Sequence, residues 1–239
     1  MRIVISSPPK TGNRWLKCLL SRIYKLDVLH GKEKPPTKPE AFQAWAAAEF
    51  SEGTIFHQHC KYSAKLCDVI DSIPAHHVTI IRDPYDVFVS MYYWVQAQAV
   101  YRAGRVRPQR PKNDLAGKPL DHPDVLEFLA TEFKVSMVRA EGWLRGGRTV
   151  ILRYEGLRRD PMAELTRATD AIAPVDPRRI EQAIEACRAE NMRQRGRQSK
   201  WHVSAAQVGE VREGLSEAHL AIFRERYADL IRALDYEVR

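Results

Sequence analysis

Short apolar runs alternate with longer stretches of helical periodicity along the chain, and this alternation limits the possible folds more than any other feature. The runs lie at residues 3–5, 54–56, 78–81 and 149–152. Apolar residues recur at one-face helical spacing over 15–23, 64–73, 84–99, 125–143, 162–172, 177–188 and 216–234. Strands that alternate with helices predict an α/β protein, here a single three-layer domain over residues 1–239 with a central, mainly parallel sheet flanked by helices.

Polar side chains gather where the predicted strands end. Lys10 follows the first strand, His57 and His59 the second, Arg82 the third and Tyr154 the fourth. Ligands of open parallel sheets bind at the carboxyl ends of the strands, so these side chains are expected to meet there. Their chemistry indicates an enzyme site for an anionic ligand.

The segment Pro9-Lys10-Thr11-Gly12-Asn13-Arg14-Trp15 stands between a predicted strand and a predicted helix. Backbone N–H groups in such a turn, with a helix N-terminus behind them, can hold an anion, and Lys10 adds a full positive charge. The lysine precedes the glycine and no leading glycine is present, so the usual nucleoside triphosphate loop is disfavoured.

The formal net charge of +8 is concentrated in two short segments. Residues 102–118 carry +5 and residues 188–202 carry +4, which leaves −1 for the rest of the chain. Both segments lack apolar periodicity, so we expect two basic loops, at about 100–122 and 188–205. Solvated loops without a partner, a nucleic acid, a membrane surface and a small polyanion all remain compatible with this charge.

Four cysteines are scattered along the chain without C-x-x-C spacing, which gives no sign of a zinc ribbon or a redox dithiol. Cys18, Cys60, Cys67 and Cys187 are therefore expected to be free thiols in a reducing compartment. No apolar run reaches the length of a membrane span, and the first residues do not resemble a signal peptide. Together these features predict a cytoplasmic protein.

Three ordered motifs resemble the sulfotransferases that use 3′-phosphoadenosine 5′-phosphosulfate (PAPS). The segment from Pro9 to Trp15 resembles their 5′-phosphosulfate loop. Arg82 at a strand end, with Ser90 eight residues on, resembles their 3′-phosphate block. Arg195-Gly196, with Trp201 five residues after the glycine, resembles a third block. The resemblance covers the chain to about residue 205 and implies a fold like that of the P-loop nucleotide hydrolases.

The resemblance also implies which residues bind PAPS and its product PAP. The backbone of Thr11, Gly12 and Asn13 would hold the 5′-phosphate, next to Arg14. Trp15 and Tyr154 would contact the purine. The 3′-phosphate would be bound by Arg82, Ser90, Arg195 and Gly196.

Catalysis in the family implies a histidine base at the second strand end and a loop lysine that stabilises the leaving group. His59 lies 23 residues before Arg82 and His57 lies 25 before it, and the family spacing favours His59. Lys10 would stabilise the leaving oxygen, and Ser90 completes the predicted catalytic set. Imidazole is largely neutral near pH 7 and can accept a proton from a hydroxyl or amine acceptor. No metal is expected.

Four positions depart from the family pattern, and at two of them His57 and His202 stand where a lysine is common. Arg14 stands where a hydroxyl residue is common, and Gln194 stands where the first arginine of the third block is expected. The alternative function classes are a nucleotide kinase-like phosphate-loop enzyme and a basic nucleic-acid-binding module. The sequence lacks the lysine motif of nucleotide kinases, which disfavours the kinase. Its basic residues gather in two loops rather than along one face, which disfavours the nucleic-acid-binding module.

The expected partner is a small-molecule, glycan or lipid acceptor. No nucleic acid and no membrane span are expected, and a homodimer is possible. The basic segment near 100–122 lies in the family's acceptor-binding region, and its charge favours an anionic or sugar-rich acceptor.

Overall fold

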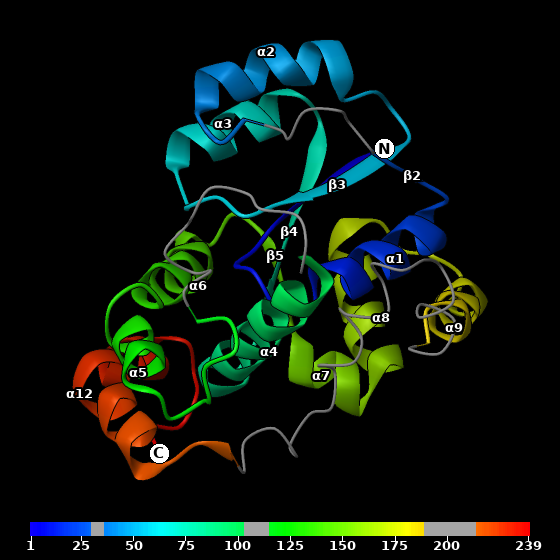
Figure 1. Ribbon diagram of the computed structural model, residues 1–239. Coiled ribbons are helices and arrows are strands. Elements are labelled where there is room, and N and C mark those ends of the chain that lie inside the picture. The colour runs from blue at the N-terminus through cyan, green and yellow to red at the C-terminus, as the bar shows by residue number, and fades with distance from the viewer. Residues whose placement is uncertain (30–35, 103–114, 189–213) are drawn as a thin grey trace. The chain divides into compact units, whose positions relative to one another are not determined.

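The computed structural model describes residues 1–29, 36–102, 115–188 and 214–239 (Figure 1). The chain divides into two compact units. The first consists of Met1–Arg82 with Arg139–Arg188, and the second of Asp83–Val138 with Ala189–Arg239. Whether they form one domain, as expected above, stays a prediction.

A parallel sheet forms the centre of the first unit, with the strand order β2-β3-β1-β4-β5. The strands are β1 (Arg2–Ser6), β2 (Asp27–Val28), β3 (Thr54–Gln58), β4 (Ala75–Ile81) and β5 (Val150–Arg153). β1 lies between β3 and β4 and pairs Val4 with Phe56 and with His77. Its residues Ile3 to Ser6 are all buried, as expected for a strand covered on both faces.

Helices cover both faces of this sheet. Val4 and Phe56 pack on one face with Phe42 from α2 (Pro39–Glu49) and Leu66 from α3 (Ala64–Ser72). Neighbouring residues of a strand point to opposite faces. Ile3 and Ile5 therefore face the other side, where Figure 1 shows α1 (Asn13–Tyr24), α8 (Pro161–Ile172) and α9 (Pro177–Ala186). The prediction of a mainly parallel sheet between two helical layers is confirmed.

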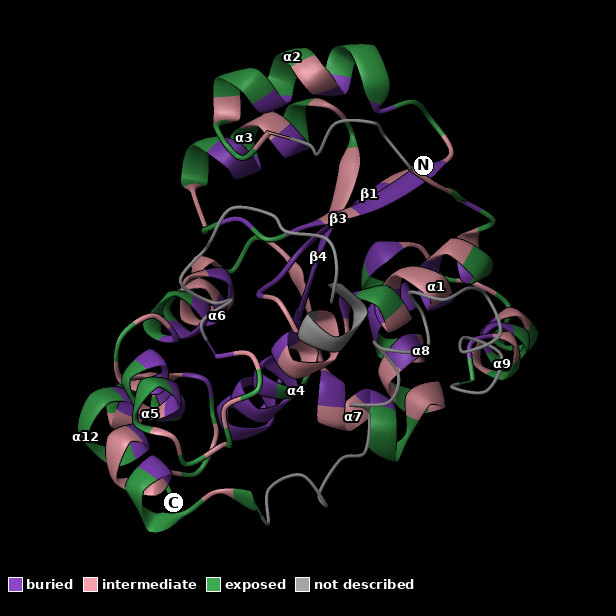
Figure 2. Cartoon of the chain, in the orientation of Figure 1, coloured by how far each residue is buried: buried purple, intermediate pink, exposed green. Residues whose placement is uncertain are grey.

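In its described residues, the second unit is helical and is built around aromatic rings. It contains α4 (Pro84–Arg102), α5 (Pro123–Ala130), the start of α6 (Lys134–Gly146) and α12 (Glu217–Ala233). The ring of Phe223 lies 4.2 Å from that of Tyr85 and 6.0 Å from that of Phe88. Figure 2 shows the first half of α4 as buried, and every residue from 81 to 92 is indeed buried.

Several boundaries differ from the sequence prediction. The helix expected over 125–143 is interrupted after Ala130, where the ring of Phe133 packs into the aromatic core. β2, α2 and α7 (Tyr154–Arg159) were not predicted. His57 belongs to β3, whereas His59 follows it. The segments 103–114 and 189–213, which hold most of the two basic loops, lie outside the described residues.

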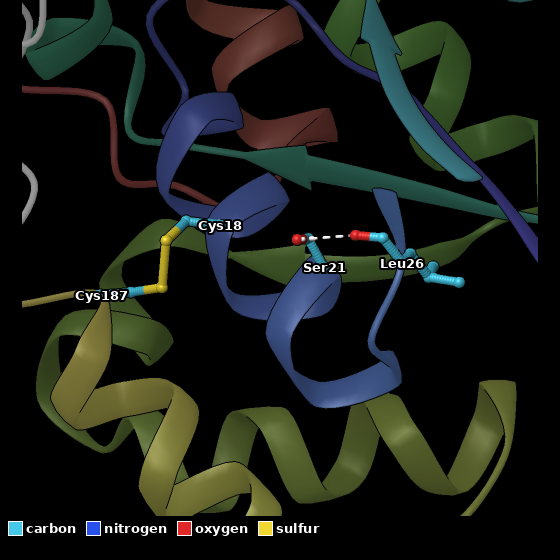
Figure 3. Close-up of a disulfide and its surroundings, with 4 residues drawn as sticks. All are labelled: Cys18, Ser21, Leu26 and Cys187. Carbon is cyan, nitrogen blue, oxygen red and sulfur yellow. Dashed lines mark hydrogen bonds between the residues drawn. A yellow bond between two sulfur atoms is a disulfide. The ribbon is translucent and has the colours of Figure 1, made fainter. Parts of the chain in front are cut away.

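The prediction of four free thiols is wrong for two of them. Cys18 on α1 and Cys187 at the end of α9 form a disulfide, with their Cα atoms 6.2 Å apart (Figure 3). They are 169 residues apart in the chain and meet because α1 and α9 pack together, which no local spacing could reveal. Cys60 and Cys67 are free and buried, and burial raises the pKa of Cys67 to about 11.

We predict that the disulfide stabilises the protein measurably. Closing so long a loop restricts the unfolded chain, so the variant C18S/C187S should lose about 2–5 kcal/mol of unfolding free energy. Urea unfolding with and without dithiothreitol measures this: the reductant should lower the midpoint of the natural sequence and leave that of the variant unchanged. Thiol titration of the urea-unfolded, unreduced protein should find Cys60 and Cys67 alone, and four titratable thiols would contradict the disulfide.

Candidate active site

The loop between β1 and α1 is held in shape by its own side chains. The Thr11 hydroxyl donates to the Pro8 carbonyl over 3.0 Å, and the Asn13 amide donates to the same carbonyl over 2.8 Å. The Asn13 amide also lies 3.1 Å from the Thr11 hydroxyl oxygen. Because these side chains are used inside the loop, the backbone of residues 11–13 is what the loop can offer to an anion.

Backbone conformation brings the loop to the N-terminus of α1. Lys10 has φ 69° and Gly12 has φ 102°, and Gly12 is the N-cap residue of the helix. Because glycine has no side chain, the N-cap residue offers no side-chain acceptor to the first N–H groups of the helix. The first N–H groups of a helix have no acceptor within it, and they carry the positive end of its dipole. This geometry suits the binding of a phosphate or sulfate group.

Four cations lie in the loop, in the first turns of α1 and directly after β4. Burial, together with the positive charges of Arg82 and Arg14, lowers the pKa of Lys10 to about 8, and burial is the largest of these causes. The Arg82 guanidinium also donates to the Lys10 carbonyl over 3.4 Å. Burial lowers the pKa of Lys17, and the charge of Arg14 adds to this shift. Like charges in partly buried positions repel one another, so a bound anion would stabilise the cluster.

The ring of Tyr154, at the start of α7, connects the loop after β1 to the residues that follow β4 and β5. A Cβ atom placed on Gly12 would lie 2.7 Å from Tyr154 Cδ2, so only glycine permits this approach. The Arg82 guanidinium carbon lies 4.2 Å from the centre of the same ring, and the Trp15 ring meets it edge-on at 5.9 Å. The structure therefore brings together Lys10, Gly12, Trp15, Arg82 and Tyr154, as the sequence predicted.

The two histidines differ in position and in partners. His59 is exposed, and its Nδ1 lies 2.8 Å from the carbonyl oxygen of Ser7, the residue that opens the loop. A carbonyl only accepts, so in the neutral imidazole Nδ1 carries the proton and Nε2 carries the lone pair. His57 is half-buried within β3, and its ring lies 5.5 Å from that of His59. This arrangement favours His59 as a proton acceptor.

Ser7 is a site residue that sequence reasoning missed. It is fully buried, and its hydroxyl accepts a hydrogen bond from the Ile80 N–H over 2.8 Å, which joins the loop to β4. Its carbonyl orients His59. The serine pair directly after the first strand was the available signal, but it indicated only a turn.

The other predicted residues belong to the second unit or fall outside the described residues. Ser90 is a buried residue of α4 in the second unit, whereas Arg82 closes the first part of the first unit. Arg195, Gly196 and Trp201 lie outside the described residues.

The described residues contain neither a metal-binding group nor a membrane-spanning helix. Within residues 1–29, 36–102, 115–188 and 214–239, no three His, Cys, Asp or Glu side chains are grouped so as to hold a metal ion. In the same part of the chain, no helix combines the length and apolarity needed to cross a membrane.

Solved structures of two enzymes have a similar fold. Mouse sulfotransferase SULT7A1, complexed with PAP, superposes with a TM-score of 0.67 at 14% identity, covering 97% of this chain and 84% of that one. Retinol dehydratase, in complex with androsterone and the inactive cofactor PAP, gives a TM-score of 0.66 at 15% identity, covering 100% and 82%. At such identities the likeness shows the fold alone. No curated protein matches the chain in sequence.

A match to a family model shows more than the fold. Residues 1–234 match the model of the sulfotransferase domain. The matched stretch includes the loop, His59, Arg82 and Tyr154, so it covers the whole cluster described above and all of the second unit up to residue 234. The chain therefore belongs to the sulfotransferase domain family.

Proposed function

We propose that this protein transfers the sulfuryl group of PAPS to a hydroxyl or amine acceptor. The observation that carries the proposal is the grouping of Lys10, Arg14 and Arg82 around the N-terminus of α1, beside the aromatic rings of Trp15 and Tyr154. PAPS offers anionic groups and a purine, which fit cations and rings respectively. The structural neighbours named above are complexes with PAP, which supports the same ligand here.

The residue roles follow the family resemblance. The backbone of Thr11, Gly12 and Asn13 binds the 5′-phosphate, with Arg14 beside it in place of the usual hydroxyl residue. Trp15 and Tyr154 contact the purine. Arg82 and Ser90 bind the 3′-phosphate, joined by Arg195 and Gly196 from outside the described residues.

The reaction we propose is an in-line transfer. His59 Nε2 accepts the proton of the acceptor while the acceptor oxygen or nitrogen bonds to sulfur, and the bond between sulfur and the bridging oxygen breaks. The bridging oxygen leaves on PAP with its negative charge, which Lys10 stabilises. Catalysis then comes from positioning and from charge stabilisation, as in phosphoryl transfer.

The acceptor class, the location and the oligomeric state stay predictions. A small-molecule, glycan or lipid acceptor is still proposed, although residues 103–114 of the basic acceptor-side loop lie outside the described residues. In the described part, the Tyr92 hydroxyl donates to the Lys118 carbonyl over 2.8 Å and so ties this loop to α4. The cytoplasmic location loses one of its grounds, because Cys18 and Cys187 form a disulfide.

The first test concerns the donor. PAP at a hundred times its dissociation constant should add about 2.7 kcal/mol of unfolding free energy and raise the melting temperature by about 5 °C or more. Matched ligands for comparison are 5′-AMP, which lacks the 3′-phosphate, and ATP. Both should cause much smaller shifts in a thermal unfolding assay at equal concentration. Equal shifts with PAP and ATP would contradict the donor assignment.

The second test concerns the base. With labelled PAPS and the best acceptor from a panel of phenols, alcohols, amines and glycans, H59A should lower kcat by about 10²–10⁴-fold. The dissociation constant for PAP should stay within about twofold, because a base that binds only the acceptor proton adds nothing to donor binding. H57A is the matched control and should keep most of the activity. If H57A instead loses it and H59A does not, His57 is the base.

The third test concerns the charge of Lys10. Its pKa of about 8 means that the free protein holds this cation below pH 8 and loses it above. The dissociation constant for PAP should therefore increase as the pH rises above 8, by up to about tenfold for each pH unit. K10R keeps the charge and should bind with little pH dependence between 7 and 9.5. K10M should bind weakly without this slope, and a wild-type slope in K10M would assign the titration to another group.

A further inference from the structure

Arg239 makes three contacts with the first turn of α4. Its guanidinium forms an ion pair with the Asp83 carboxylate, Nη2 to Oδ2, over 3.1 Å. Its backbone N–H donates to the Tyr85 hydroxyl over 2.9 Å. Its guanidinium carbon also lies 4.9 Å from the centre of the Tyr85 ring. Arg239 thus contacts both the carboxylate of Asp83 and the aromatic ring of Tyr85 at the start of one helix.

Asp83 makes this contact important because it is buried and shapes the helix start. Its side chain is 5% exposed. Its Oδ1 accepts the Tyr85 N–H over 2.9 Å, and its carbonyl accepts the Val87 N–H over 2.9 Å, so it caps α4 as the sequence predicted. A buried carboxylate is costly unless a cation and hydrogen-bond donors compensate it. The Arg239 guanidinium places its positive charge beside Oδ2, while Oδ1 accepts the hydrogen bond that caps α4.

Arg239 is itself held by α12. The Arg224 guanidinium of α12 donates to the Arg239 carbonyl over 3.3 Å and also pairs with Glu217. Phe223, also on α12, packs its ring 4.2 Å from that of Tyr85. Two sets of contacts therefore join α12 to the first turn of α4, one through Phe223 and the other through Arg239. All of these residues belong to the second unit.

We propose that Arg239 is a positioning residue for the binding of the donor's 3′-phosphate. This inference rests on the proposed function, in which Arg82 and Ser90 bind that phosphate. Asp83 follows Arg82 directly in the chain, and Ser90 lies on the helix that Asp83 caps. Without the guanidinium, the buried Asp83 carboxylate loses a charge partner, and both the chain after Arg82 and the helix that carries Ser90 lose a restraint. The loss concerns the 3′-phosphate and spares the 5′-side of the nucleotide, which the loop at residues 10–13 binds.

A pair of ligands that differ by one phosphate tests this. Dissociation constants for PAP and for 5′-AMP are measured by titration calorimetry, and their ratio reports the contribution of the 3′-phosphate. R239A should reduce the preference for PAP by about threefold to tenfold and leave 5′-AMP binding within about twofold. With PAPS as substrate, KM should rise while kcat at saturation stays near that of the natural sequence.

Matched variants separate positioning from general damage. R239K keeps the charge and should restore most of the preference for PAP. R232A removes an arginine of α12 that pairs with Asp229 on the exposed surface, and it should change nothing. D83N keeps an oxygen acceptor for the helix cap and removes the charge, so it should repeat the effect of R239A and add little to it in the double variant. D83N also serves as the test if R239A does not fold.

The outcomes are distinguishable from failure of the proposed function. If the natural sequence binds PAP and 5′-AMP equally, the donor assignment is wrong. If it prefers PAP and R239A and D83N keep that preference in full, the proposal for Arg239 is wrong. An equal loss of affinity for both ligands would also overturn it, because a merely structural role would not select the 3′-phosphate.

Discussion

The contact between Gly12 and the ring of Tyr154 determines how the candidate site is assembled. Gly12 has φ 102°, and a side chain there would overlap the Tyr154 ring, so both the backbone conformation and the close approach require glycine. Through this ring the loop after β1 meets the ends of β4 and β5, because the Arg82 guanidinium and the Trp15 ring lie against it too. A parallel sheet supplies the strand ends, and this one contact brings their side chains together.

The same assembly concentrates positive charge where little water screens it. Burial and the charges of Arg82 and Arg14 hold the pKa of Lys10 at about 8. Such a cluster lowers the stability of the free protein and becomes favourable when an anion binds. Binding sites often lower stability in this way for the sake of function. This positive cluster lies outside the two basic segments, in the part of the chain whose formal net charge is −1.

Local patterns in the sequence were sufficient for much of the fold. The apolar runs predicted β1, β3, β4 and β5, and Asp83 and Pro84 predicted the start of α4, because buried strands and helix caps are short-range features. β2 has two residues and α7 has six, too few for a clear pattern, and α2 buries only Phe42 and Ala46. The break before α6 depends on Phe133 packing into the aromatic core, which is a tertiary effect.

The sequence by itself determined the α/β class, the order of the strand-end residues and the family, because strand periodicity and motif spacing are written along the chain. The tertiary structure alone decided contacts between distant residues. Cys18 and Cys187 form a disulfide across 169 residues, the Ser7 carbonyl orients His59, and Arg239 pairs with Asp83. These depend on which helices and loops pack together, and packing brings together residues whose separation in the chain follows no pattern.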